Sequence, residues 1–312
     1  MGFKSLIAPT AHWAAHVSGE SVRRALRQHA ARIITFHAVG VADCPAKVFE
    51  AQIRFLQQHF KIVPLATLVK NLHASNAAID GQVALTFDDG LRNNGLVAYP
   101  ILKRLGTPAT FFICPGVVDG GGWLWNQDCR RRLLSLPSAA AAALADSLGH
   151  PGATSDQVVD WMKTLPTHSR RHVEQIIRGA TPNFQPRDNE RLRYDLMGWD
   201  ELKALDSALI TLGAHSTNHP ILANCTPAEL IEEIHDCRAL LEKRLDRAVE
   251  FFCYPNGDFN PAVVKFAART YTAAVTTRPG FVRPGVDLHQ LPRLNTANTL
   301  SHFTWRLFRP SA

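Results

Sequence analysis

The sequence predicts an α/β protein whose strands form a parallel sheet or a barrel. Short runs of β-branched and aromatic residues alternate along most of the chain with segments whose apolar residues recur at helical spacing. Several strand-like runs also end on polar or ionisable residues, and parallel β/α barrels build their active sites on the face where all strands end. These residues are His37, Asp88, Asp89, His215, Tyr254, Pro255, Asn256, Gly257 and Arg293.

The composition indicates a globular protein and excludes one large class of partners. With 312 residues, of which 46% are hydrophobic, the chain can bury a sizeable core. The net charge of +7 and the isoelectric point near 9.3 arise from dispersed lysines and arginines. Because no basic stripe stands out, we expect no nucleic-acid partner.

Cysteine spacing and apolar run lengths limit the compartment and the kind of site. No two of the six cysteines stand in a Cys-x-x-Cys spacing, which argues against a cysteine zinc site and favours isolated reduced thiols. No apolar run approaches the roughly 20 residues of a membrane span, and no signal-peptide pattern is found. We therefore expect a cytoplasmic protein. Residues 302–309 predict a packed terminal helix, with a peripheral membrane contact as the alternative.

Local patterns predict the elements of the first third of the chain. Residues 20–31 form a basic helix, whose arginines either face solvent or meet a membrane surface. Residues 33–36 form a strand that ends on His37. The further expected elements are a helix at 45–60, an extended piece at 62–63, a helix at 65–72, a strand at 83–87, a helix at 96–105 and a strand at 107–113.

The alternation of strands and helices is interrupted between residues 119 and 198. This segment contains an alanine-rich run and frequent Pro and Gly, so we interpret it as a largely helical insertion and not as a second domain. The expected organisation is an N-terminal helical extension over 1–31, a barrel over 32–300 that includes the insertion 119–198, and a C-terminal tail over 301–312.

The pattern resumes after the insertion. The longest helix is expected at 227–245, where Thr226 and Glu229 form a capping box before a buried apolar stripe. The other expected elements are a helix at 199–205, strands at 209–214 and 249–254, a helix at 261–270, and strands at 271–277 and 291–294.

Asp88 and Asp89 directly follow the buried strand at 83–87, and Gly90 follows them. Taken alone, this run also fits a turn with two solvated acids. Adjacent side chains on an extended backbone point to opposite sides, however, so two neighbouring acids at a strand end can take two different tasks.

His215 and His219 are four positions apart, which places two imidazoles on one face of a helical turn. Imidazole nitrogens are common ligands of zinc and other first-row metals, although this spacing alone is a weak indicator. With one carboxylate of the aspartate pair it becomes a two-histidine, one-carboxylate site that leaves positions open for water and substrate. One aspartate would then bind the metal and the other would accept a proton.

Three motifs together resemble those of the polysaccharide deacetylase family, also called carbohydrate esterase family four. They are Thr86-Phe87-Asp88-Asp89-Gly90, His215-Ser216-Thr217-Asn218-His219 and Phe252-Cys253-Tyr254-Pro255-Asn256-Gly257. The resemblance spans residues 32–296 with the insertion allowed. It implies a distorted (β/α)7 barrel and the metal-dependent removal of acetyl groups from an N-acetylated sugar, oligosaccharide or lipid-linked glycan.

The resemblance also implies roles for single residues. Asp88 would be the general base. A divalent metal ion, zinc first and cobalt, nickel or manganese as alternatives, would be bound by Asp89, His215 and His219. The substrate would be contacted by Tyr254, Pro255, Asn256 and Gly257, with the backbone N–H of Asn256 at the oxyanion.

The sequence departs from the family pattern in two places. Cys253 stands where the third motif often carries an arginine that steadies the base, and His289 does not form a convincing Leu-x-His motif for the acid. The chain is more similar to the branch of poly-N-acetylglucosamine deacetylases, in which a strand-end histidine near the N-terminus is the acid. We therefore expect His37 as the general acid. Arg293 is either the replacement for the missing arginine or an ordinary salt-bridged residue.

Two other functions stay open on the sequence. The same metal site would serve an amide hydrolase that acts on a small non-sugar substrate, and a sugar-binding protein without turnover would keep the barrel but lose the metal. Trp123, Trp125 and Trp199 either pack against a sugar ring or belong to the core.

Overall fold

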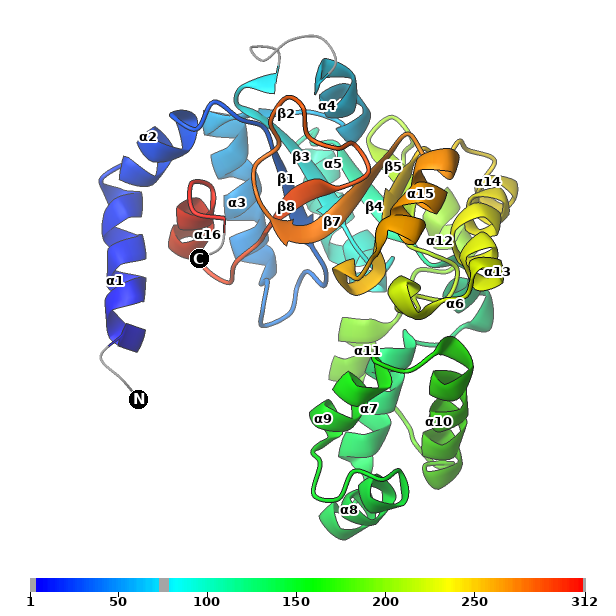
Figure 1. Cartoon of the computed structure of the whole chain (residues 1–312). Helices are drawn as coiled ribbons and strands as arrows, with labels where there is room; N and C mark the ends of the chain where they lie inside the picture. The colour runs from blue at the N-terminus through cyan, green and yellow to red at the C-terminus, as the bar shows by residue number, and fades with distance from the viewer. Residues whose placement is uncertain (1–3, 73–78, 311–312) are drawn as a thin grey trace.

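The computed structural model describes residues 4–72 and 79–310, so residues 1–3 of the expected extension and 311–312 of the expected tail lie outside the described part. Seven parallel strands follow one another in the order β1-β8-β7-β6-β5-β4-β3, and pairing of β1 with β3 closes them into a barrel (Figure 1). This confirms the predicted distorted (β/α)7 barrel. The strands are β1 (Arg32–Phe36), β3 (Gln82–Phe87), β4 (Ala109–Ile113), β5 (Ile210–Ala214), β6 (Phe251–Cys253), β7 (Ala273–Pro279) and β8 (Leu291–Asn295), and the short β2 (Lys61–Ile62) pairs with the beginning of β3.

Helices cover the outside of this barrel (Figure 1). The long helix expected at 227–245 is divided into three parts, because a π-helical segment, η4 (Ile231–Asp236), separates α13 (Pro227–Leu230) from α14 (Cys237–Leu245). Such π-helical turns often mark functional sites. The other covering helices are α3 (Ala46–His59), α4 (Leu65–Leu72), α5 (Tyr99–Arg104), α12 (Trp199–Lys203) and α15 (Pro261–Thr270), with the π-helical turn η2 (Asn94–Ala98) before α5.

Alternation along β3 determines which side chains face each side of the barrel wall. Phe87 packs in the hydrophobic layer beneath the helices, with its ring centroid 4.9 Å from that of Phe36 and 4.8 Å from that of Phe111. Thr86 points to the opposite side, where its hydroxyl accepts a hydrogen bond from Arg293. Neighbouring residues of a strand point to opposite sides. Asp88, two residues after Thr86, therefore lies on the same side of the barrel wall as Thr86.

The terminal helices are α1 (Lys4–Val17), α2 (Glu20–Leu26) and α16 (Leu300–Arg306). They are joined to the barrel by Arg32 in β1, which is 1% exposed. Its guanidinium donates hydrogen bonds to the backbone oxygens of Ala25 (2.5 Å), Ala30 (3.0 Å) and Leu307 (2.8 Å). One buried cation therefore connects both ends of the chain to the first strand.

The terminal regions differ in one respect from the expected elements and agree in another. The helix expected at 20–31 ends at Leu26, because the following residues turn into the barrel and Ala31 already pairs with Val282. The C-terminal residues form a helix that packs against α1, where the rings of His12 and His302 stack 4.7 Å apart. Within the described residues, no helix has both the length and the apolar character needed to cross a membrane.

The segment expected as a helical insertion is helical and extends from one end of the barrel (Figure 1). It has a small hydrophobic core of its own, which includes Trp125, Cys129, Val159 and Ile177, and Ile221 from the loop after β5 joins that core. Its helices, with α6 leading into it, are α6 (Pro115–Gly120), α7 (Trp125–Ser135), α8 (Ser138–Ser147), α9 (Ser155–Met162), α10 (Thr167–Ala180) and α11 (Asp188–Tyr194).

We predict that Phe111→Ala lowers the free energy of unfolding by about 3–5 kcal/mol, because it leaves a cavity in the aromatic layer between β3 and β4. Phe111 is fully buried, whereas Leu96, the control residue, is 59% exposed. Urea denaturation followed by circular dichroism measures both variants. Equal stabilities of Phe111→Ala and Leu96→Ala would contradict the assigned core.

Candidate active site and metal centre

The structure brings most of the predicted site residues together where the strands end. His37 follows β1, the aspartate pair follows β3, and both histidines of the second motif follow β5. Arg293 reaches the same place from within β8. The site residues whose charged or ring atoms lie within 4 Å of those of at least one other are His37, Asp88, Asp89, His215, His219 and Arg293.

Asp89, His215 and His219 form a buried cluster whose potential ligand atoms all lie within 4.8 Å of one another. Oδ1 of Asp89 is 3.4 Å from Nε2 of His215 and 3.6 Å from Nε2 of His219. These separations are longer than the roughly 2.7–3.2 Å of an N–H···O hydrogen bond. They match the roughly 3.3–3.6 Å between ligand atoms that surround a tetrahedral ion at 2.0–2.2 Å. The donor set therefore fits a divalent metal ion.

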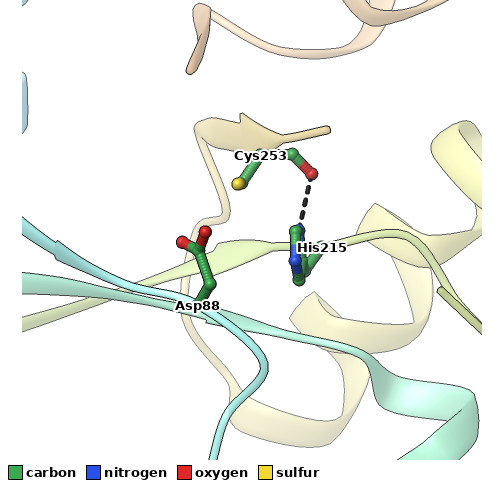
Figure 2. A group of neighbouring side chains, drawn as sticks. All are labelled: Asp88, His215 and Cys253. Carbon is green, nitrogen blue, oxygen red and sulfur yellow. Dashed lines mark hydrogen bonds between the residues drawn. The ribbon is translucent and has the colours of Figure 1, made fainter. Parts of the chain in front are cut away.

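The orientation of His215 leaves one nitrogen for such an ion. Its Nδ1 donates a hydrogen bond of 2.7 Å to the backbone oxygen of Cys253 at the end of β6 (Figure 2). Because a carbonyl oxygen only accepts, Nδ1 carries a proton. Burial lowers the pKa of His215, but Cys253 and the carboxylates of Asp89 and Asp88 outweigh it and raise the pKa well above its ordinary value. Nε2, which faces Asp89, would therefore give up its proton to bind a metal ion. Metal-binding histidines usually have this kind of partner on their second nitrogen.

The protonation states also suit a metal site. Burial opposes ionisation of Asp89, but His215, His37 and His219 outweigh it and keep the pKa of Asp89 below its ordinary value. Burial, together with the neighbouring His215, lowers the pKa of His219 to about 4. The carboxylate is thus charged and the His219 imidazole neutral at physiological pH, and these are the forms that bind metals.

The segment from His215 to His219 is not a helical turn, and in this respect the expectation from its spacing is wrong. It is an irregular loop in which Ser216 (φ 60°) and His219 (φ 54°) have left-handed backbone conformations. The two rings meet nevertheless, with centroids 4.9 Å apart. Asp89 (φ 73°) also leaves the extended path assumed for adjacent strand residues, and Asn256 (φ 52°) is left-handed as well. In the described part of the chain, these are four of the six non-glycine residues with positive φ, so backbone strain is concentrated here.

Buried polar contacts hold this strained loop. Glu233 in η4 accepts hydrogen bonds from the backbone N–H (2.8 Å) and the side-chain amide (2.9 Å) of Asn218. The hydroxyl oxygen of Ser216 accepts from the backbone N–H of His219 at 3.0 Å. Gly116 in α6 packs so closely that a Cβ there would lie 2.5 Å from the Oδ1 of Asn218. The loop is thus fixed by the elements on both sides of it.

Trp125, in the first turn of α7, brings the insertion into contact with the same loop. Its indole Nε1–H donates a hydrogen bond of 2.8 Å to the backbone oxygen of His219. The indole is buried, and the guanidinium carbon of Arg170 lies 4.5 Å from the centre of its ring system. Trp125 therefore supports the loop that carries His219 and is not available to stack on a sugar.

Asp88 and Arg293 form a fully buried ion pair beside the metal centre. The guanidinium donates to both carboxylate oxygens, with 2.7 Å for each hydrogen bond. Burial raises the pKa of Asp88, but Arg293 outweighs this effect, and the pKa lies well below its ordinary value. Asp88 therefore stays charged, and the bidentate hydrogen bond fixes the plane of its carboxylate.

A second group of potential ligands, Asp88, His215 and Cys253, lies beside the first (Figure 2). Arg293 already contacts two of its members, because the same Nη2 donates to Asp88 and lies 3.2 Å from the Sγ of Cys253. A guanidinium at this place repels a cation. Burial also raises the pKa of Cys253 and keeps it a neutral thiol. Of the two groups, Asp89, His215 and His219 are therefore the better donor set for a cation.

His37 stands at the open side of the centre. Its Nε2 is 3.8 Å from the Oδ2 of Asp88, and its side chain is 56% exposed, whereas that of Asp88 is 2% exposed. A pocket of about 390 Å³ adjoins His37 and Asp89, and the insertion contributes Arg130 of α7 and Tyr194 of α11 to its wall. We call this the catalytic pocket. Solvent and a ligand can reach His37 through it.

The turn after β6 exposes its backbone at Asn256, whereas its first side chain, that of Tyr254, faces the protein interior. Tyr254 is fully buried, and its hydroxyl donates a hydrogen bond of 2.9 Å to the backbone oxygen of His289. Pro255 is buried too, whereas Asn256 is exposed. Gly257 is required, because a Cβ there would lie 1.8 Å from the Oγ1 of Thr277. A substrate contact by this turn stays a prediction, and for Tyr254 the side chain is not accessible for it.

Sequence reasoning missed three supporting residues. Trp125 and Glu233 hold the histidine loop, and Thr86 accepts a hydrogen bond from Arg293 at 3.1 Å. Thr86 could have been found from its place, two residues before Asp88 on the same side of the strand. No sequence signal connects Trp125 or Glu233 to a loop that lies 94 or 15 positions away.

Comparisons with known proteins identify the family and the shared fold. The model of the polysaccharide deacetylase family matches residues 75–275. YxkH of Bacillus subtilis (strain 168), classed as a polysaccharide deacetylase, is 20% identical over 274 residues, which are 86% of this chain and 72% of YxkH. Among solved structures, the deacetylase PplD of Streptococcus pyogenes, in complex with acetate, is similar with a TM-score of 0.61 and 19% identity over 91% of this chain and 98% of PplD. IcaB from Ammonifex degensii gives a TM-score of 0.58 and 16% identity over 88% of this chain and 97% of IcaB. These structural similarities show the shared fold.

We predict that Trp125→Phe weakens zinc binding by about tenfold. Phenylalanine keeps an aromatic ring at this position but cannot donate the hydrogen bond to His219. Competition with a chromophoric chelator measures the affinity of protein that was first stripped with EDTA. Trp199→Phe is the matched control, since its indole N–H donates to Asp119 at 2.8 Å, remote from the ligands. An unchanged zinc affinity of Trp125→Phe would show that the contact does not hold the loop.

Proposed function

The chain belongs to the polysaccharide deacetylase family, and we propose that it removes an N-acetyl group from an N-acetylated sugar, oligosaccharide or lipid-linked glycan in a metal-dependent hydrolysis. One observation carries this proposal. Three ligand atoms with the spacing of a metal site, from Asp89, His215 and His219, lie beside a carboxylate that is held by Arg293 and is not needed as a ligand. A metal with a free base next to it is the arrangement that amide hydrolysis requires.

Asp89, His215 and His219 would hold the metal ion, zinc or another divalent first-row metal. When bound, such an ion lowers the pKa of a coordinated water from ~16 toward ~7 and polarises the carbonyl of the acetamide. The three protein ligands are the number that catalytic zinc sites use, so positions remain for water and substrate. The hydrogen bond from His215 to Cys253 supports this assignment, because it turns Nε2 toward Asp89.

Asp88 would act as the general base that takes a proton from the attacking water. Its carboxylate is charged, buried and held in one orientation by Arg293, which is therefore a positioning residue. An ordinary surface or salt-bridged role for Arg293 does not account for a guanidinium that lies inside the barrel and contacts the proposed base. The strong ion pair keeps Asp88 ionised, and proton transfer must work against that stabilisation.

His37 would donate the proton to the departing amine. Its position supports this role, because it lies 3.8 Å from Asp88 and faces the catalytic pocket with more than half of its side chain exposed. An exposed imidazole can regain a proton from solvent after each turnover. The backbone N–H of Asn256, in the exposed turn after β6, would stabilise the oxyanion.

We predict that Asp88→Asn lowers kcat for acetate release by roughly 10²-fold or more, the usual contribution of a general base. Acetate release from N-acetylglucosamine oligomers is measured with the zinc-loaded enzyme, next to acetamide and other small amides as substrates. Asp146→Asn, on an exposed part of α8, is the matched control. Wild-type turnover of Asp88→Asn would exclude the base role, and faster hydrolysis of the small amides would point to a non-sugar substrate.

We predict that Arg293→Met moves the acidic limb of the pH profile of kcat/KM upward by about one pH unit or more. In the wild type the ion pair keeps the pKa of Asp88 low, so the base remains active as the pH falls. Without Arg293, only His215 and His37 oppose the effect of burial, so the pKa of Asp88 rises and the base is lost at a higher pH. Arg293→Lys should reverse part of this upward shift, because lysine supplies a positive charge but cannot form the bidentate hydrogen bond. Profiles that differ in height but not in shape would contradict this positioning role.

A further inference from the structure

We propose that the pocket between α6, α7 and α10 binds the phosphate group of a glycosyl phosphate. This pocket, of about 580 Å³, is lined by Trp123, by four arginines of α7 and α10, and by Asn218 next to the metal ligand His219. We call it the arginine pocket. Because it can be tested by binding alone, the proposal does not rest on the deacetylase function.

The arginine pocket is separate from the catalytic pocket, because α7 lies between them. Trp125, Asp128 and Arg132 face the arginine pocket. Gln127 and Arg130, on another face of the same helix, line the catalytic pocket. A ligand in the arginine pocket therefore lies beside the catalytic centre without contact to Asp89 or His37.

The charges of the arginine pocket do not balance. Asp128 is already bound on both oxygens, with Arg132 at 2.8 Å from Oδ1 and Arg178 at 2.9 Å from Oδ2. Glu174 forms an ion pair with Arg170. These two carboxylates face four guanidinium groups, so the pocket keeps two positive charges in excess.

Arg171 and Arg178 hold this excess charge at the rim of the pocket. Both side chains are exposed, and among the described residues no carboxylate forms an ion pair with Arg171. They stand seven positions apart on α10, about two turns, and therefore on the same side of that helix. Guanidinium groups match phosphate oxygens with two parallel hydrogen bonds, which makes a doubly charged phosphate the best-fitting anion.

The floor of the pocket is rigid and contains an aromatic surface. Arg170 is 4% exposed and lies over the ring of Trp125, whose indole N–H is bound to His219. Trp123 is partly buried, and its indole N–H donates to Asp195 at 2.7 Å, which fixes the orientation of its ring. An aromatic face beside the exposed guanidinium groups of Arg171 and Arg178 suits a sugar ring that carries a phosphate.

The double variant Arg171→Gln/Arg178→Gln tests the proposal. Binding of α-glucose 1-phosphate, inorganic phosphate, glucose and glucuronate is measured by isothermal titration calorimetry on the full chain in EDTA. We expect wild-type protein to bind glucose 1-phosphate more tightly than inorganic phosphate, and the double variant to lose at least about tenfold in affinity for both. Arg132 still satisfies Asp128 in this variant, and thermal melting checks that it is folded.

Arg54→Gln/Arg104→Gln is the matched control, since it removes the same charge from two exposed arginines that pair with Glu50 on another part of the barrel. Equal phosphate affinities of the two double variants would overturn the site. Such a result would show that phosphate binding depends only on the net charge of the protein and not on these two arginines. Glucuronate binding as tight as glucose 1-phosphate would overturn the assignment to phosphate. The single variant Arg171→Gln, with an expected smaller loss, replaces the double variant if that protein melts early.

Acetate release from a neutral N-acetylated oligomer is measured in parallel. If the double variant loses phosphate binding but keeps acetate release, the two sites are independent, as we expect. If wild-type protein binds glucose 1-phosphate but releases no acetate, the proposed function fails and the phosphate site stands. If wild-type protein binds neither phosphate compound, the phosphate site fails, whatever the result for acetate.

Discussion

The contact between Arg293 and Asp88 is the constraint on which the active centre depends. The guanidinium has five N–H groups, and the structure gives it five acceptors, namely both oxygens of Asp88, the hydroxyl of Thr86, the backbone oxygen of Thr276 and the sulfur of Cys253. A buried charge is costly unless it is paired and hydrogen-bonded. Complete satisfaction explains how a barrel of seven strands tolerates an arginine in its interior. It also explains Cys253, because a small side chain at the end of β6 leaves room for a guanidinium that arrives from β8.

Much of the fold could be predicted from the sequence, because most strands are short apolar runs that are followed directly by a polar or ionisable residue. The parallel arrangement then brings distant residues together at one face, and the meeting of Asp89 with His215 follows from topology alone. Local backbone conformations were less predictable. The spacing of His215 and His219 suits a helix, but Ser216 and His219 have positive φ, and tertiary contacts from Glu233 and Trp125 maintain that conformation. Periodicity contains no information on such contacts.

The insertion has two relations to the metal centre. It contributes to the wall of the catalytic pocket, and through Trp125 it supports the backbone of His219, a proposed metal ligand. Its own hydrophobic core gives α7 a stable base, since Cys129 and Leu133 of that helix are buried in it. A sequence that interrupts the alternation of strands and helices can thus still be part of the site. The strained loop after β5 shows how: its conformation is maintained by Trp125 of the insertion together with Glu233 of the helices that cover the barrel.

The origin of Arg293 in the last strand has a consequence for biosynthesis. Asp88 precedes it by 205 positions. At about 5–20 residues per second, a ribosome needs roughly 10–40 s to add the residues between them. During this interval the Asp88 carboxylate has no counter-ion, and desolvating it inside a half-built barrel is unfavourable. The barrel interior around Asp88, the proposed base, can therefore close favourably only after β8 has emerged from the exit tunnel and supplied Arg293.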